Sequence, residues 1–263
     1  MSKINKVHAR QVFDSRGNPT IEAEVILQDG SVGNAIVPSG ASTGSYEAHE
    51  LRDKNKDYLN KSVFDAVSNI NNKISIALTN KDSTNQNKID EILINLDGTE
   101  NKSKIGANAI LAASIASLKV SAKISKNEIF KHNNKTGNFF IPYPLMNIIN
   151  GGAHANNSLE IQEFMIRPDS ADSFTKCLQM SFLVIQNLKK LLEKKNLSTN
   201  VGDEGGFAPS LNSDKEAIEI ILESINLAGL KPGKDISICL DVAANEIQKA
   251  KKTEYYLELL KKY

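Results

Sequence analysis

The chain has 263 residues, which is enough to bury a substantial core and to form one large or two moderate domains. Its formal net charge is +1, from 32 Lys and Arg against 31 Asp and Glu, so the composition offers no global electrostatic reason to bind nucleic acid or an anionic membrane. The two cysteines, Cys177 and Cys239, lie far apart without a CxxC spacing, which argues against a zinc site or a disulfide framework.

The amino-terminal residues lack the apolar core of a signal sequence, and no stretch offers the ~20 apolar residues that span a bilayer. We therefore expect no membrane insertion and a reducing, cytoplasmic location.

The first half of the chain predicts strands followed by helices. Residues 20–27 begin as an alternating strand with Glu22 and Glu24 on one face, and Asp29-Gly30 predicts a hairpin turn into a second strand over 32–37. Apolar residues at helical spacing follow over 63–74, and the small residues of 107–115 suit a closely packed helix. Antiparallel strands followed by helices indicate an α+β domain over residues 1–133.

Polar turn residues over 133–138 mark a domain boundary, and the second domain is expected over 134–263. Apolar runs at 139–149 and 161–166, helices near 173–195 and 214–227, and a short strand at 236–240 alternate as in an α/β barrel. A complete (β/α)₈ barrel takes about 250 residues. The remaining length therefore accommodates only the first part of a TIM-like barrel.

Residues 201–209, with the sequence VGDEGGFAP, set Asp203 and Glu204 among glycines in a segment without strand or helix pattern. Taken alone, such a segment also fits an ordinary surface turn. Three further runs accompany it, namely PSGASTG at 38–44, NGGAH at 150–154 and IQEFM at 161–165. Together with FDSRGNPT at 13–20, LDGTENKS at 96–103 and LDVAA at 240–244, these runs resemble the enolase family of magnesium-dependent lyases over almost the whole chain.

This resemblance implies a fold, namely an α+β amino-terminal domain followed by an incomplete enolase-type α/β barrel. It also implies the reversible dehydration of 2-phosphoglycerate to phosphoenolpyruvate, in glycolysis and gluconeogenesis. By the same resemblance we expect a homodimer or an assembly of dimers. The resemblance also allows surface or secreted pools beside the cytoplasmic protein.

The resemblance assigns roles to four residues of the second domain. Glu204 occupies the position of the proton donor, Glu163 contacts substrate and assists that donor, and Gln162 and His154 bind substrate. From pattern alone, Glu163 and Gln162 could be outward-facing residues of a strand, and His154 could be a turn or surface histidine. A carboxyl group that donates a proton near neutral pH needs a raised pKa, which burial or the negative charges of Asp203 and Glu163 would supply to Glu204.

Two further residues match magnesium ligands of the family. Asp241 follows the apolar residues 238–240, at the end of an expected barrel strand where catalytic groups of this fold gather, although a helix N-cap fits the same pattern. Ser42 lies in the loop 38–44, which corresponds to a lid that brings a second Mg²⁺ to bound substrate, and which pattern alone would make an ordinary mobile connection. Arg16 ranks lower, with a structural role near the site or at a dimer interface.

The sequence contains no match for the family's base lysine, for two further acidic metal ligands or for several substrate-binding residues. The first hypothesis is therefore a carboxyl-terminally incomplete enolase that does not catalyse by itself. The alternative is a naturally shortened, noncatalytic protein that acts in binding or assembly. A third reading, another dehydratase of the wider superfamily, is weaker because those relatives generally lack the lid run and the GDEGG run together.

Overall fold

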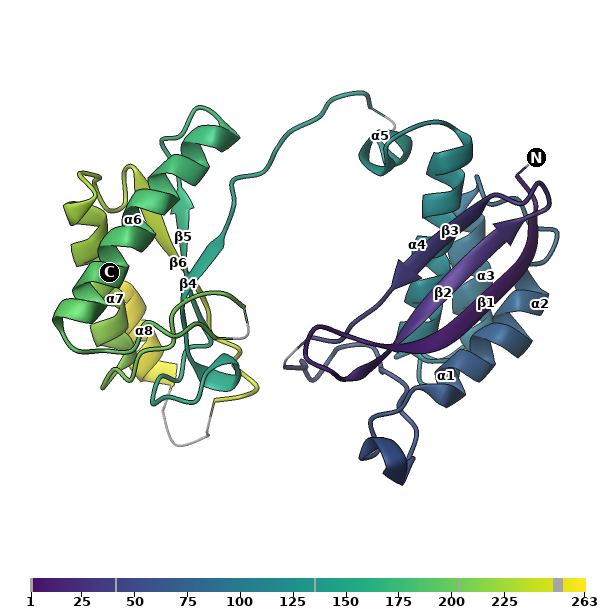
Figure 1. Cartoon of the computed structure of the whole chain (residues 1–263), viewed down its shortest axis with the longest axis horizontal. Helices are drawn as coiled ribbons and strands as arrows, with labels where there is room; N and C mark the ends of the chain where they lie inside the picture. The colour runs from purple at the N-terminus through teal and green to yellow at the C-terminus, as the bar shows by residue number, and fades with distance from the viewer. Residues whose placement is uncertain (1, 41, 135, 203, 248–252) are drawn as a thin grey trace. The chain divides into compact units, whose positions relative to one another are not determined.

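The computed structural model describes residues 2–40, 42–134, 136–202, 204–247 and 253–263. Contacts divide the chain into two compact units, one comprising Met1–Gly40 and Tyr46–Phe139 and the other comprising Ala41–Ser45 and Phe140–Tyr263 (Figure 1). The segment that includes Ser42 is therefore grouped with the second unit.

The first unit contains an antiparallel sheet in the order β1-β2-β3, formed by β1 (Ile4–Phe13), β2 (Pro19–Leu27) and β3 (Val32–Ile36). The expected hairpin joins β2 to β3, and Gly30 takes the positive φ of 84° that its turn requires. Ile21, Ala23, Val25 and Leu27 of β2 point into the core, while Glu22 and Glu24 both pair with Arg10 of β1. Strand β1 was not anticipated from the sequence.

Helices cover one face of this sheet (Figure 1). The helix expected over 63–74 continues as α1 (Phe64–Asn69), the π-helical turn η2 (Ile70–Ile74) and α2 (Ser75–Leu78). The other helical elements of the unit are η1 (Lys56–Tyr58), α3 (Gln86–Asp97), α4 (Ala107–Ile124) and α5 (Ile129–Asn133).

The small residues of α4 allow its backbone to approach the sheet closely. A Cβ on Gly33 of β3 would lie 2.4 Å from the Val120 nitrogen and 2.5 Å from the Ala116 oxygen. Among the described helices, α4 alone is long and apolar enough to cross a membrane, with a mean hydropathy of 1.2. The sequence reading expected no such stretch. Because Ala109, Ala112, Ala113 and Ala116 are fully buried in the unit, α4 is a core helix here.

The run LDGTENKS forms a turn organised by Asp97, which is 1% exposed. Its carboxylate accepts hydrogen bonds from the backbone N–H groups of Thr99 (2.9 Å), Lys104 (3.1 Å) and Ile105 (2.6 Å). Burial raises the pKa of Asp97, but the hydrogen bonds from Thr99, Ile105 and Lys104 together outweigh burial and leave the pKa below its usual value.

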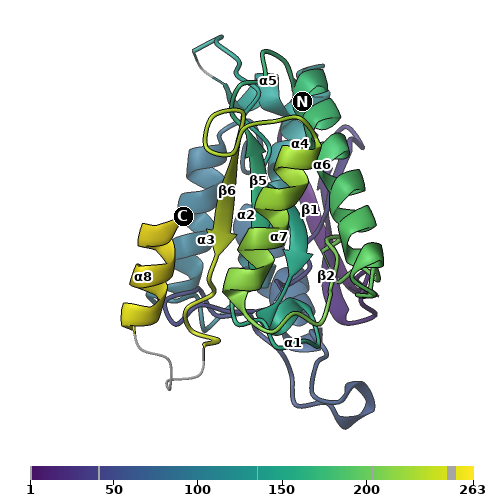
Figure 2. The same cartoon turned by 90° about the vertical axis from the view of Figure 1, so that its left-hand side faces the viewer.

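The second unit contains a sheet in the order β4-β5-β6, formed by β4 (Met146–Asn150), β5 (Glu163–Pro168) and β6 (Ile236–Asp241). Helices α6 (Phe174–Lys194) and α7 (Asp214–Leu227) lie on the same face of this sheet (Figures 1 and 2). Both helices begin where the sequence predicted, at N-caps in which Ser173 and Ser213 accept a backbone hydrogen bond. The unit also contains η3 (Gly152–His154) and α8 (Thr253–Lys262).

The strands of the second unit pair differently from a parallel barrel, because β5 is antiparallel to both β4 and β6. Only the single turn η3 lies between β4 and β5, without the long helix that usually carries the chain back in a parallel crossover, and β5 runs antiparallel to β4. Of the apolar run 139–149, only the part from Met146 onward is strand, and Phe139, Phe140 and Ile141 are exposed. The antiparallel pairing brings the start of β5 to the same sheet edge as the ends of β4 and β6.

Candidate active site

His154 follows β4 in a tight turn that glycines make possible. A Cβ on Gly151 would lie 2.4 Å from the Ile161 oxygen, and Gly152 has a φ of 50°. The backbone N–H of His154 donates to the Gly151 oxygen at 3.0 Å. His154 is thereby directed inward and is 4% exposed, so the alternative of a surface histidine is wrong.

Glu163 is the first residue of β5, and Gln162 directly precedes it. The Gln162 backbone is fixed on both sides, since its N–H donates to the Asp241 oxygen (3.1 Å) and its oxygen accepts from Gly151 (2.9 Å). The Gln162 side chain is 4% exposed, its Nε2 donates to Ser42 Oγ at 3.3 Å, and its Oε1 is buried without a hydrogen-bond partner. The alternative that Gln162 is an outward-facing polar residue is therefore wrong.

The loop that carries Glu204 is attached to β4 through its backbone. Phe207 donates to the Ile148 oxygen (2.9 Å) and accepts from the Asn150 nitrogen (2.8 Å). A Cβ on Gly202 or Gly206 would lie 2.9 Å from the Asn150 side chain, so both glycines are needed for this approach. Asp203 lies outside the described residues.

Asn150 is a fully buried residue at the centre of this attachment. Its Nδ2 donates to the Gly206 oxygen at 2.6 Å, its Oδ1 accepts from Asn147 at 2.7 Å, and its backbone oxygen accepts from Asn157 at 2.9 Å. The sequence reading included Asn150 in a motif but gave it no role. The available signal was an amide placed directly after an apolar strand.

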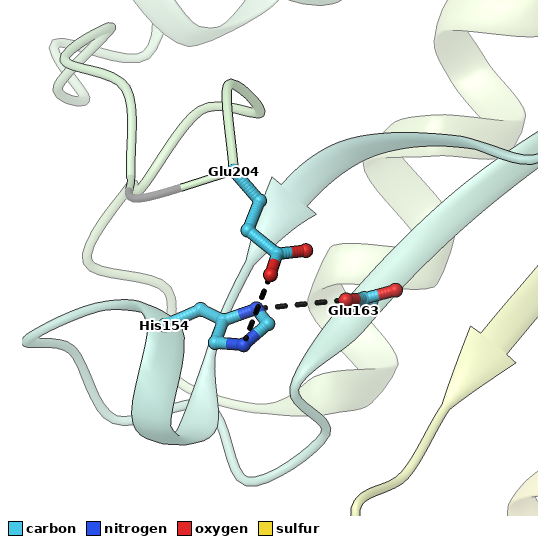
Figure 3. A group of neighbouring side chains, drawn as sticks. All are labelled: His154, Glu163 and Glu204. Carbon is cyan, nitrogen blue, oxygen red and sulfur yellow. Dashed lines mark ion pairs between the residues drawn. The ribbon is translucent and has the colours of Figure 1, made fainter. Parts of the chain in front are cut away.

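His154, Glu163 and Glu204 converge (Figure 3). His154 Nδ1 is 3.6 Å from Glu163 Oε1, and His154 Nε2 is 3.5 Å from Glu204 Oε1. Both distances exceed ordinary hydrogen bonds, and the buried Nδ1 has no hydrogen-bond partner. One ligand atom from each residue lies within 4.8 Å of the others, so the group could also surround a cation.

The carboxyl group of Glu163 is strongly perturbed. The pKa of Glu163 is raised to about 7, chiefly by burial. A hydrogen-bonding interaction with Glu204 and the negative charge of Glu204 come next, and the charge of Asp241 adds the smallest part. The raised pKa thus belongs to the carboxyl group beside the predicted donor. Glu163 is mostly buried and Glu204 is exposed, so desolvation acts more strongly on Glu163.

Asp241 ends β6 at the same sheet edge, directly opposite Glu163. Its Oδ1 accepts a hydrogen bond from the backbone N–H of Ala243 at 2.9 Å, which closes an Asx turn. The alternative of a helix N-cap is wrong, because residues 242–247, which follow Asp241, form no helix. Asp241 is exposed and retains oxygens for a ligand.

The chain matches two family models, "Enolase, N-terminal domain" over residues 4–132 and "Enolase, C-terminal TIM barrel domain" over residues 138–262. It is 59% identical over 253 residues to the enolase of Pelagibacter ubique, covering 96% of this chain and 60% of that protein. It is 49% identical over 258 residues to the enolase of Corynebacterium kroppenstedtii, covering 98% of this chain and 60% of that protein.

An α+β unit followed by a second unit whose sheet gathers acidic residues at one edge fits the pair of domains that these two family models describe. The chain belongs to the enolase family. It spans about 60% of the length of the curated relatives that it matches.

Proposed function

We propose that this chain forms the proton-donating part of an enolase active site, which dehydrates 2-phosphoglycerate reversibly to phosphoenolpyruvate in glycolysis and gluconeogenesis. The observation that carries the proposal is the convergence of His154, Glu163 and Glu204 on one sheet edge, with the pKa of Glu163 raised to about 7. A carboxyl pair that retains a proton near neutral pH is suited to acid catalysis.

Glu204 is the proposed donor to the departing hydroxide, because it is the exposed member of the pair and can approach a bound substrate. Glu163 holds a proton close to Glu204 and supplies it. His154 and Gln162 bind substrate, and the buried atoms without hydrogen-bond partners, His154 Nδ1 and Gln162 Oε1, are available for that purpose. The two carboxyl groups therefore have different roles set by their different burial.

The residues present fit Mg²⁺. Asp241 supplies hard carboxylate oxygens at the sheet edge opposite Glu163, and among the described residues no Lys or Arg forms an ion pair with it. In the proposal Asp241 holds one Mg²⁺ and Ser42 a second one when substrate is bound. When bound, the metal stabilises negative charge on the substrate carboxylate.

The 263 residues by themselves are proposed not to turn over substrate, because they offer no match for the base lysine or for two acidic metal ligands of the family. The proposed setting is the cytoplasm, with homodimer formation as in the family. The second candidate is a noncatalytic protein that acts in binding or assembly.

The test begins by sequencing the native coding region beyond the codon for Tyr263. If the reading frame continues, the full-length protein is purified and phosphoenolpyruvate formation is followed by absorbance with Mg²⁺. We expect Glu204→Gln to lower dehydration by about 10²-fold or more while exchange of the substrate C2 proton with solvent persists. Glu91→Gln, an exposed residue of α3, is the matched control.

Unchanged dehydration in the Glu204→Gln protein would overturn the donor assignment. If the frame stops at Tyr263 and the purified chain gives no phosphoenolpyruvate, the noncatalytic candidate replaces the enzyme.

A further inference from the structure

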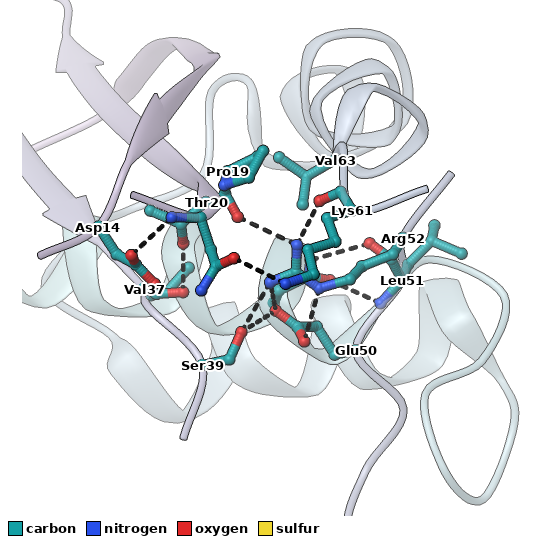
Figure 4. Close-up of polar contacts among 12 residues, drawn as sticks. Asp14, Pro19, Thr20, Val37, Ser39, Glu50, Leu51, Arg52, Lys61 and Val63 are labelled. Carbon is teal, nitrogen blue, oxygen red and sulfur yellow. Dashed lines mark hydrogen bonds and ion pairs between the residues drawn. The ribbon is translucent and has the colours of Figure 1, made fainter. Parts of the chain in front are cut away.

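Arg52 uses every N–H donor of its guanidinium group (Figure 4). Its Nε and Nη2 donate to the two carboxylate oxygens of Glu50 at 3.1 and 2.9 Å. Its Nη2 also donates to Ser39 Oγ at 2.8 Å. Its Nη1 donates to the backbone oxygens of Pro19, at 3.1 Å, and Lys61. One side chain thus joins four segments of the first unit.

Ser39 is held from several sides by this group. Its hydroxyl donates to Glu50 Oε1 and accepts from Arg52, and its backbone oxygen accepts from Arg16 Nη2. The Arg16 backbone in turn donates to the Asp14 carboxylate at 2.9 Å. Ser39 is therefore fixed through both its side chain and its main chain.

The segment that carries Glu50 and Arg52 is itself anchored at the start of α4. His49 donates to the Asn101 oxygen at 2.7 Å, and its own oxygen accepts from Ala107 at 2.8 Å. Asn108 bonds Leu51 in both directions, accepting at 3.2 Å and donating at 3.1 Å. Arg52 consequently links Ser39 to a rigid part of the first unit.

The contacts of the chain change just after this anchored residue. The first unit ends at Gly40 and resumes at Tyr46, and the intervening segment is grouped with the second unit. We propose that Arg52 is a positioning residue that fixes the start of the loop 38–44 at Ser39, so that any displacement of the loop begins at Gly40. The functional side of this inference rests on the proposed function, in which Ser42 of that loop binds a metal ion with substrate.

Lysine cannot replace arginine in this position. Its ammonium group is a point charge without the planar fork that contacts Glu50, Ser39 and two backbone oxygens together. Arg52→Lys should therefore release Ser39 while it retains the positive charge. Arg10→Lys is the matched control, because the ion pairs of Arg10 with described residues are to Glu22 and Glu24, on the outer face of the same unit.

The experiment measures ¹⁵N relaxation order parameters of the 263-residue chain, which requires no turnover. In the unsubstituted protein and in Arg10→Lys we expect an order parameter near 0.85 for the Ser39 amide, falling below about 0.6 in Arg52→Lys. Amides of β1 and β2 should keep their values. Ser39→Ala, which removes only the hydrogen bonds of the hydroxyl group, should give an intermediate value. It provides the test if Arg52→Lys does not fold.

An unchanged Ser39 amide, or an equal loss of order throughout β1 and β2, would overturn the anchor. In the full-length protein we expect Arg52→Lys to lower kcat/KM about tenfold, with Arg10→Lys unchanged. If Ser39 loosens and kcat/KM is unaffected, the functional side of the inference is overturned. If the full-length parent has no turnover, the proposed function fails and the relaxation result for the anchor stands.

Discussion

Glu163 and Asp241 stand directly opposite each other in the antiparallel register of β5 and β6. Opposite residues of paired strands place their side chains on the same face, so the two carboxyl groups interact although 78 positions separate them in the numbering. The charge of Asp241 acts on Glu163 together with burial and the nearer Glu204.

Glu204→Gln should lower the pKa of Glu163 from about 7, because it removes the larger of the two neighbouring negative charges. Asp241→Asn should lower it in the same direction by less. The measurement is a pH titration of the Glu163 side-chain carboxyl by ¹³C NMR without added metal. Glu193→Gln, exposed on α6, should leave the titration unchanged, and an identical curve in all variants would contradict the electrostatic cause.

Glu163 should also make stability depend on pH. Its folded pKa of about 7 lies above the ordinary value of 4.5, so its protonated form contributes stability that is fully present below pH 4.5. This contribution is lost as the pH rises through about 7. The free energy of unfolding of the parent, measured by urea unfolding relative to that of Glu163→Gln, should therefore fall as the pH rises from 4.5 to 8. A difference that is constant over this range would count against the raised pKa.

Gly33→Ala should destabilise the first unit by about 1–3 kcal/mol, because the added Cβ would press on the backbone of α4. Thermal unfolding followed by circular dichroism measures the effect. Asn34→Ala, the exposed neighbour on β3, is the control and should change stability by less than about 0.5 kcal/mol. Equal effects of the two substitutions would show that the close approach of α4 is not limiting.

Asp97→Asn should cost about 1–3 kcal/mol, because an amide cannot accept all the backbone hydrogen bonds that the carboxylate receives. The folded pKa of Asp97 is lowered, so its contribution is present above the ordinary carboxyl pKa and is lost as the pH falls through the folded value. Urea unfolding from pH 7 to 2 should show the two proteins converging in acid. Glu100→Gln, exposed in the same turn, should follow the parent at every pH.

Local patterns in the sequence predicted the elements whose signals are local. The Asp29-Gly30 hairpin, the serine-capped helices α6 and α7, and strand β6 all lie close to their predicted bounds. The orientation of β5 could not be predicted in this way. It depends on the absence of a long crossover helix between β4 and β5, where the structure has only the short η3, whereas the alternation of later helices and strands suggested a parallel barrel.

Family motifs predicted the residues of the site, because spacing in the sequence alone does not indicate that His154, Glu163 and Glu204 lie together. The burial of His154 and Gln162 and the raised pKa of Glu163 emerge only from the fold. Arg52 was missed because its partners lie as far as 33 positions away and most are backbone atoms or small side chains that carry no sequence signal. Those partners become visible only when distant segments are folded together.

The attachment of the loop 201–207 to β4 relies on the backbone of Phe207 and on two glycines packed against Asn150, with no part taken by the Glu204 side chain. Support and the proposed chemistry therefore fall on different residues of one short loop. We expect the attachment to survive replacement of the side chain at position 204, which makes this position a convenient entry point for redesign of the site.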